Sequence, residues 1–127
     1  MPITYEVLRN GHYIHALAAG NVSGSEFIKY EIDHAADEKV SGPLMEILEI
    51  NYGALREINS EDVKRIIDIR KKEKPSVMPH KCAIVISAGD AKSWDIAKFY
   101  EGMVELHLPE TVIVFGDLDI ARTWLGV

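Results

Sequence analysis

The 127-residue chain has a single cysteine, Cys82, so it can form neither an internal disulfide nor a zinc site built on several cysteines. No apolar run approaches the roughly 18 residues that cross a bilayer. Residues 1–6 lack the basic and apolar regions of a signal peptide. From these absences we expect a cytoplasmic protein without membrane insertion.

The chain also lacks an excess of positive charge, because 14 Lys and Arg residues against 20 Asp and Glu residues give a formal net charge of −6. A nucleic-acid partner usually requires a basic surface, so we expect none. The clustered cations stand at the end of an expected helix, where they interact favourably with the helix dipole. A local patch for an acidic partner is the less favoured interpretation. The cluster contains Arg70, Lys71, Lys72 and Lys74.

Motifs for phosphate binding, acyl transfer and metal binding are missing as well. Residues 87–90 contain one glycine and no Lys-Ser or Lys-Thr, unlike a phosphate-binding loop, and the chain has no Gly-x-Ser-x-Gly. His12 and His15 are three residues apart on an expected strand, where such residues point to opposite faces. Cys82 begins an apolar run, which favours an inert core position. We therefore expect no cofactor and no metal.

What the sequence does contain is the pattern of one ordinary α/β domain over residues 1–127. Alternating or continuously apolar segments predict strands over 3–9, 12–19, 44–50, 82–86 and 111–115. Helical spacing predicts helices over 25–38, 61–74 and 92–107, and a short one from 118. The order ββαβαβαβα predicts a five-stranded mixed sheet wound as a right-handed βα superhelix. Strand 1 runs antiparallel and strands 2–5 run parallel.

The first two strands are expected to form a hairpin, because Asn10-Gly11 favours a two-residue type I′ turn. That register places Glu6 opposite His15 and Leu8 opposite Tyr13. The Glu–His pair can be an ordinary ion pair, which we favour, or an acid/base pair. Other local expectations are that Ser60 and Asp117 cap helices.

Residues 115–125, Phe-Gly-Asp-Leu-Asp-Ile-Ala-Arg-Thr-Trp-Leu, together with the element order, resemble the SpoIIAA-like family of STAS-type domains. The resemblance implies the wound sheet and a closing helix in which Trp124 and Leu125 pack against it. The wider superfamily includes bacterial anti-sigma-factor antagonists and lipid-binding Sec14-like domains.

The chain departs from those antagonists at one position. They carry an Asp-Ser pair after the third strand, and the serine is phosphorylated to release a partner. Here that strand is followed by residues 51–53, Asn-Tyr-Gly. We therefore interpret Ser60 as a helix cap and not as a phosphorylation switch.

Glu46 and Glu49 lie on opposite faces of the expected third strand. A carboxylate on a central strand needs a partner or water. Glu49 is the better ligand candidate, because ligands of parallel sheets bind outside the carboxyl ends of the strands. The loops at that edge supply further polar and aromatic candidates. These are Asn51, Tyr52, Ser87, Asp90, Trp94 and Asp117.

The hairpin face that carries Glu6 and His15 is expected to remain outside the helix layer. Leu8, Tyr13 and Leu17 would form an apolar patch on it, bounded by the Glu–His pair. A homodimer through this face is the simplest way to cover the patch.

These observations favour a non-enzymatic regulatory or binding domain that acts through an unknown protein partner or a small molecule. The alternative is a Sec14-like binder of an apolar or lipid-like ligand, which would need a large apolar pocket. A small enzyme using carboxylate and histidine acid–base chemistry ranks lower and would need convergent, perturbed carboxylates in a cleft.

Overall fold

The computed structural model describes residues 2–72 and 80–127. They form one five-stranded sheet with the strand order β1-β2-β3-β4-β5, in which β1 is antiparallel to β2 and all other neighbours are parallel. This confirms the expected fold and element order. The strands are β1 Ile3–Leu8, β2 Tyr13–Ala18, β3 Leu44–Ile50, β4 His80–Ile86 and β5 Thr111–Phe115. The helices are α1 Gly24–Ala35, α2 Ser60–Lys72, α3 Ala91–His107 and α4 Leu118–Leu125.

The β1–β2 hairpin has the expected register, with Glu6 opposite His15. Asn10 and Gly11 both have positive φ, 56° and 93°, and His12 N donates to Arg9 O at 3.1 Å. The connection is nevertheless longer than the expected two-residue type I′ turn, because β1 ends at Leu8, β2 begins at Tyr13, and His12 O accepts from Met45 N of β3. Arg9 also has positive φ, at 51°, which the sequence pattern did not indicate.

Three helix starts show how local sequence sets the element boundaries. Ser23 and Glu26 form a reciprocal capping box at α1. Asp117 caps α4 by accepting from Ile120 N at 3.0 Å, as expected. The expectation for Ser60 is wrong, because the preceding Asn59 accepts from Asp62 N at 2.9 Å and Ser60 is the first helical residue. Because the side-chain oxygen of Asn59 accepts from the N–H three residues later, the helix begins one residue earlier than a Ser60 cap would allow.

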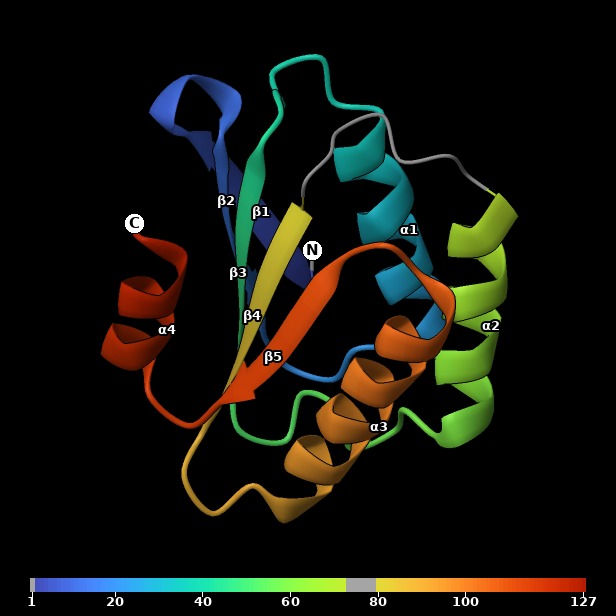
Figure 1. Cartoon of the computed structure of the whole chain (residues 1–127). Coiled ribbons are helices and arrows are strands. Elements are labelled where there is room, and N and C mark those ends of the chain that lie inside the picture. Colours follow the sequence, from blue (N-terminus) through green and yellow to red (C-terminus); the bar gives the residue numbers. More distant parts are fainter. Residues whose placement is uncertain (1, 73–79) are drawn as a thin grey trace.

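The helices divide unequally between the two faces of the sheet. Figure 1 shows α1, α2 and α3 on one side and α4 alone on the other. The three parallel crossovers therefore share one face and one hand, the right hand expected of such units. The main core lies under these three helices and includes Ile14, Val22, Ile67 and Val104, each at most 1% exposed.

A second, smaller core lies under α4, which packs on β3, β4 and β5. Leu125 is buried there, whereas Trp124 is partly exposed, so α4 is anchored as the resemblance implied. Tyr13 belongs to the same cluster, but the rest of the β1–β2 face beyond it is uncovered. No described helix has both the length and the apolar character needed to cross a membrane.

Two expected elements end differently or lie partly outside the described residues. β4 begins at His80, two residues before the apolar run of the sequence. The expected helix over 61–74 is described as far as Lys72, so Lys74 of the basic cluster lies outside the described residues.

Candidate functional site

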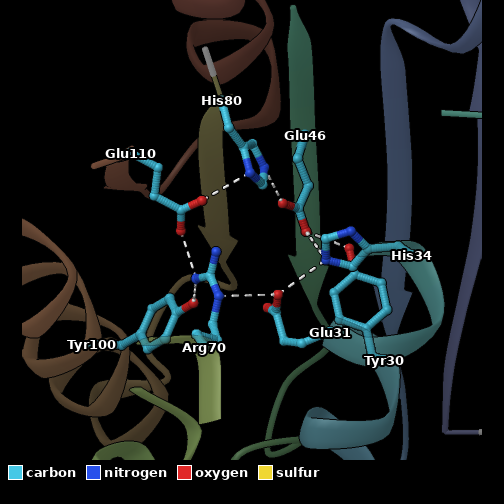
Figure 2. A network of polar contacts seen from close by, with 8 residues as sticks. All are labelled: Tyr30, Glu31, His34, Glu46, Arg70, His80, Tyr100 and Glu110. Carbon is cyan, nitrogen blue, oxygen red and sulfur yellow. Dashed lines mark hydrogen bonds and ion pairs between the residues drawn. The ribbon is translucent and has the colours of Figure 1, made fainter. Parts of the chain in front are cut away.

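A buried polar network is the most unusual feature of the helix-covered face. It begins at Glu46 on β3, a central strand, where the side chain is only 3% exposed. Glu46 Oε1 lies 2.7 Å from His80 Nε2, and Oε2 accepts a hydrogen bond from the Tyr30 hydroxyl. Figure 2 shows the carboxylate enclosed between these groups. Glu46 thus has the partners that a buried carboxylate requires.

His80 connects two carboxylates through its two ring nitrogens. While Nε2 faces Glu46, Nδ1 lies 2.8 Å from Glu110 Oε2. A neutral imidazole can donate from one nitrogen only, so the geometry selects the doubly protonated imidazolium. Burial disfavours that cation, but the hydrogen bonds to Glu110 and Glu46 outweigh burial and raise the pKa of His80 to about 10.

Arg70 continues the network from the last turn of α2. Its Nη1 lies 2.5 Å from Glu110 Oε1 and also donates to the Tyr100 hydroxyl. Its Nε lies 3.5 Å from Glu31 Oε2 on α1. Figure 2 shows the guanidinium between the two carboxylates. Burial raises the pKa of Glu110, but His80 and Arg70 outweigh it and hold that pKa below the usual range.

His34 closes the network on α1. Its Nε2 lies 3.0 Å from Glu31 Oε2 and 3.9 Å from Glu46 Oε2. Burial opposes protonation, but the charges of Glu46 and Glu31 outweigh it and raise the pKa of His34. Its Nδ1 is buried and has no hydrogen-bond partner among the described residues.

The network joins five elements of the fold at one end of the sheet. Charged forms of its two histidines and one arginine balance its three carboxylates, so the buried cluster can be electrically neutral as a whole. Tyr30 and Tyr100 lie at its two ends, and burial raises the pKa of both phenols far above 10. The arrangement fixes α1, α2 and the start of β5 to the central strands. Its members are Tyr30, Glu31, His34, Glu46, Arg70, His80, Tyr100 and Glu110.

A metal ion is one chemical possibility within this network, because Glu31, His34 and Glu46 each bring a ligand atom within 4.8 Å of the others. The surrounding charges argue against it. Both oxygens of Glu46 already face donors, and Arg70 and the His80 imidazolium place positive charge beside the same carboxylates. A divalent cation would have to displace these groups, so the cluster is best described as an internal charge network.

An apolar cavity of about 50 Å³ lies beside the network, between the three helices and the sheet. Glu31 and Tyr100 contribute to its wall, and the rest of its lining is apolar, for example Leu48, Ile58 and Ile84. For comparison, an engineered apolar cavity that binds benzene has a volume of about 150 Å³. The cavity is therefore too small for a lipid-like ligand unless the helices move apart.

On the sheet face that α4 partly covers, the uncovered part carries the predicted hairpin residues Glu6, His15 and Leu17. A shallow groove of about 490 Å³ lies there, lined by side chains of β1, β2 and β3. His15 Nε2 lies 2.8 Å from Glu49 Oε1, and both side chains are somewhat under one-third exposed. The side-chain partner of His15 is thus Glu49 on the parallel neighbour, and not Glu6. The side chain of Glu6 is exposed and has no ion-pair or hydrogen-bond partner among residues 2–72 and 80–127.

The predicted apolar patch on this face is divided. Tyr13 is 3% exposed because it lies in the cluster under α4, whereas Leu8 is 39% exposed at the end of β1. Leu17 lies in the groove and is only partly buried. The expectation of an exposed Tyr13 is wrong because α4 extends far enough to cover the start of β2.

The residues predicted at the carboxyl edge serve mainly as turns and caps. Asp90 accepts from Ser93 N at 3.3 Å and from Gly53 N at 2.8 Å, so it joins the β3–α2 loop to the start of α3. Ser87 donates to Ile50 O at 3.2 Å, and Asp117 caps α4. The three remaining loop candidates are exposed: Asn51, Tyr52 and Trp94. Glu49 points into the groove on the α4 side, where it does not join them.

The sequence indicated that a carboxylate on the central third strand needs a partner, but it favoured Glu49 as the functional one and did not reveal the partners of Glu46. Two signals were available. Arg70 occupies the inner stripe of α2 among Val63, Ile66 and Ile67, where a charge requires a buried counter-ion. His80 stands two residues before a continuously apolar run, 82–86.

No family model, no curated protein and no solved structure matches the chain significantly.

Proposed function

We propose that the chain is a non-enzymatic binding domain with a regulatory role, and that another protein docks on the part of the sheet that α4 leaves uncovered. As part of the same proposal, the chain belongs to the SpoIIAA-like family and acts in the cytoplasm. The element order and the closing helix support membership of the family, and the single cysteine supports a cytoplasmic location.

One observation carries the proposal: α4 covers β3–β5, while the groove over β1 and β2 is open beside it. An apolar side chain, Leu17, lies in this groove next to the His15–Glu49 pair. Apolar surface bordered by hydrogen-bonding groups is typical of sites where proteins interact.

The charge of the groove indicates the character of the partner. Glu6 and Glu49 both line it, and Glu6 has no counter-ion within the described part of the chain. The chain as a whole carries a net charge of −6. A partner surface with a basic side chain opposite Glu6 and an apolar side chain against Leu17 would complement it.

The alternatives have less support. A Sec14-like function needs room for an apolar ligand, and the cavity under the helices is about 50 Å³. Acid–base catalysis needs perturbed carboxylates that a substrate can reach, whereas Glu46 and Glu110 are buried behind histidine and arginine.

The test is photo-crosslinking of Leu17→benzoylphenylalanine in the native host, compared with Leu106→benzoylphenylalanine at a 76% exposed position on α3. We expect a defined adduct from position 17 alone. The identified protein should bind the purified chain, and Leu17→Asp should weaken that binding at least tenfold while Leu106→Asp should not. Equal adducts from both positions, or binding indifferent to Leu17→Asp, would contradict the proposal. If native mass spectrometry shows a bound small molecule that Leu17→Asp removes, the groove is a small-molecule site and not a protein docking site.

A further inference from the structure

The two edge strands of the sheet, β1 and β5, differ in whether a side chain binds their outward-facing backbone groups. At the β5 edge, Glu101 Oε2 accepts from Val114 N at 2.8 Å, so a side chain occupies an outward-facing amide. Blocking of this kind is how natural sheets prevent further strands from adding. Among the described residues, no side chain does the same for β1.

The register of the hairpin identifies which β1 groups are free. Ala19 N donates to Pro2 O at 2.8 Å, so Pro2 is bonded toward β2. In an antiparallel pair, bonded and non-bonded positions alternate. Thr4 and Glu6 therefore bond toward β2, whereas Ile3, Tyr5 and Val7 direct their N–H and C=O groups outward. These three alternate residues could therefore form backbone hydrogen bonds with a further strand along the exposed edge of β1.

We propose that a second copy of the chain adds to this edge, with β1 pairing antiparallel to β1 about a two-fold axis at Tyr5. The inference deepens the proposed function, because the open faces of two hairpins would then form one continuous surface. Its test uses the purified chain alone, so failure of the dimer and failure of the groove as a docking site can be distinguished.

The charge of Glu6 and the number of paired outward residues together favour this register over its neighbours. With the axis at Tyr5, Ile3 lies opposite Val7 of the second copy, and Thr4 lies opposite Glu6 of the second copy. Moving the axis to Glu6 would place two copies of Glu6 directly opposite each other, which is unfavourable. The Tyr5 axis also pairs all three outward residues, 3, 5 and 7, whereas the shifted axis pairs only two of them.

The surroundings of the edge allow a second copy to approach. On the helix side, a hollow of about 310 Å³ lies beside Ile3 and Tyr5, lined also by Lys29 and Asp33 of α1. Val7 of the second copy would lie next to this hollow. Because the hollow carries both signs of charge, two α1 helices can face each other across the axis without net repulsion.

The first experiment is sedimentation equilibrium of the wild type and of charge variants at Thr4 and Glu6, whose exposure allows substitution without loss of the fold. We expect a wild-type dimer at high micromolar concentration. Each dimer contains two Thr4–Glu6 contacts, so Thr4→Glu should weaken it roughly 2- to 30-fold and Thr4→Lys should tighten it. Glu6→Lys combined with Thr4→Glu should restore it. A wild-type monomer would overturn the inference, as would a dimer broken by Leu17→Asp and indifferent to Thr4→Glu.

The second experiment tests the register directly by disulfide trapping. Thr4 and the opposing Glu6 would form a non-hydrogen-bonded pair, with Cα atoms about 4.5 Å apart, within the range for a disulfide. A mixture of Thr4→Cys and Glu6→Cys chains should therefore crosslink across the dimer. Glu6→Cys alone should not, and the buried Cys82 provides the wild-type background. Efficient crosslinking of Glu6→Cys to itself would contradict the Tyr5 axis.

Discussion

His80 and Glu46 form a buried ion pair across β3 and β4, with 2.7 Å between Nε2 and Oε1. The two residues are not direct neighbours in the register, since His80 pairs with Leu44 and Glu46 with Cys82. The imidazole reaches across two positions because its other nitrogen is held by Glu110. This bridge links the centre of the sheet to the residue just before β5.

The first prediction is a narrow pH range of maximum stability. The pKa of His80 is about 10 in the folded chain against an ordinary 6.5, so its stabilising contribution is present below 6.5 and is lost as pH rises toward 10. The pKa values of Glu46 and Glu110 lie below the ordinary 4.5, so their contribution is lost as pH falls below that value. The free energy of unfolding should therefore be greatest between about pH 4.5 and 6.5.

Urea unfolding at intervals from pH 4 to pH 9 checks this expectation. The range stops short of pH 10, where tyrosine ionisation begins in the unfolded chain. We expect a decline of several kcal/mol between pH 6.5 and 9, at about 1.4 kcal/mol per pH unit where His80 dominates. His107→Gln, at an exposed site, should leave the profile unchanged. A flat profile above pH 6.5 would show that His80 is not held as the cation.

The second prediction compares two glutamates on one strand. Glu46→Gln removes the charge that balances buried His80 and should cost about 3–5 kcal/mol of unfolding free energy. Glu49→Gln affects a partly exposed pair with His15 and should cost about 0–1 kcal/mol. Both are measured by chemical denaturation at pH 6. Similar losses for the two variants would mean that the network contributes no more than a surface ion pair.

The third prediction concerns Gly11 in the hairpin turn. Its φ is +93°, and an added Cβ would lie 2.2 Å from Lys39 O. Gly11→Ala therefore combines backbone strain with a collision against main chain, and we expect a loss above about 2 kcal/mol. Gly20→Ala is the matched control, because Gly20 has φ +76° but nothing within 4 Å of an added Cβ. It should lose about 1–2 kcal/mol from strain alone. Thermal unfolding of both variants measures the difference, and equal losses would exclude the collision.

The fourth prediction separates two residues of α4. Leu125 is 6% exposed, and Leu125→Ala should cost about 2–4 kcal/mol. Trp124 is only partly buried, with Phe115 at 5.6 Å between ring centroids and Lys81 Nζ at 5.6 Å from its ring. Trp124→Ala should cost about 1–2 kcal/mol, less than the 3–5 kcal/mol of a fully buried tryptophan. A larger loss for Trp124→Ala than for Leu125→Ala in urea unfolding would reverse this assignment.

The fold could be predicted from the sequence because each of its determinants is local. The Asn10-Gly11 turn sets the hairpin and its register, and the alternation of strands with helices sets the parallel order. One exception was also local, since Asn59 caps α2 in place of Ser60. The other was not, because Tyr13 is covered by α4 from the far end of the chain.

The candidate sites could be predicted less well, because they depend on contacts between distant segments. Glu46 and His80 are 34 residues apart, and no periodic pattern relates them. Glu6 and His15 do lie opposite each other, yet Glu49 on the parallel neighbour binds the imidazole. The register of a strand determines which residues are adjacent, but it does not determine with which of two neighbours a long side chain forms a hydrogen bond.

Backbone hydrogen exchange along β1, followed by NMR at increasing protein concentration, tests most directly whether the hairpin edge is a docking surface. Thr4 and Glu6 bond toward β2 and should exchange slowly at every concentration, which provides an internal control. Ile3, Tyr5 and Val7 should exchange rapidly in dilute solution and become protected as the second copy adds. Rapid exchange of these three amides at all concentrations, or protection already complete in dilute solution, would contradict the account.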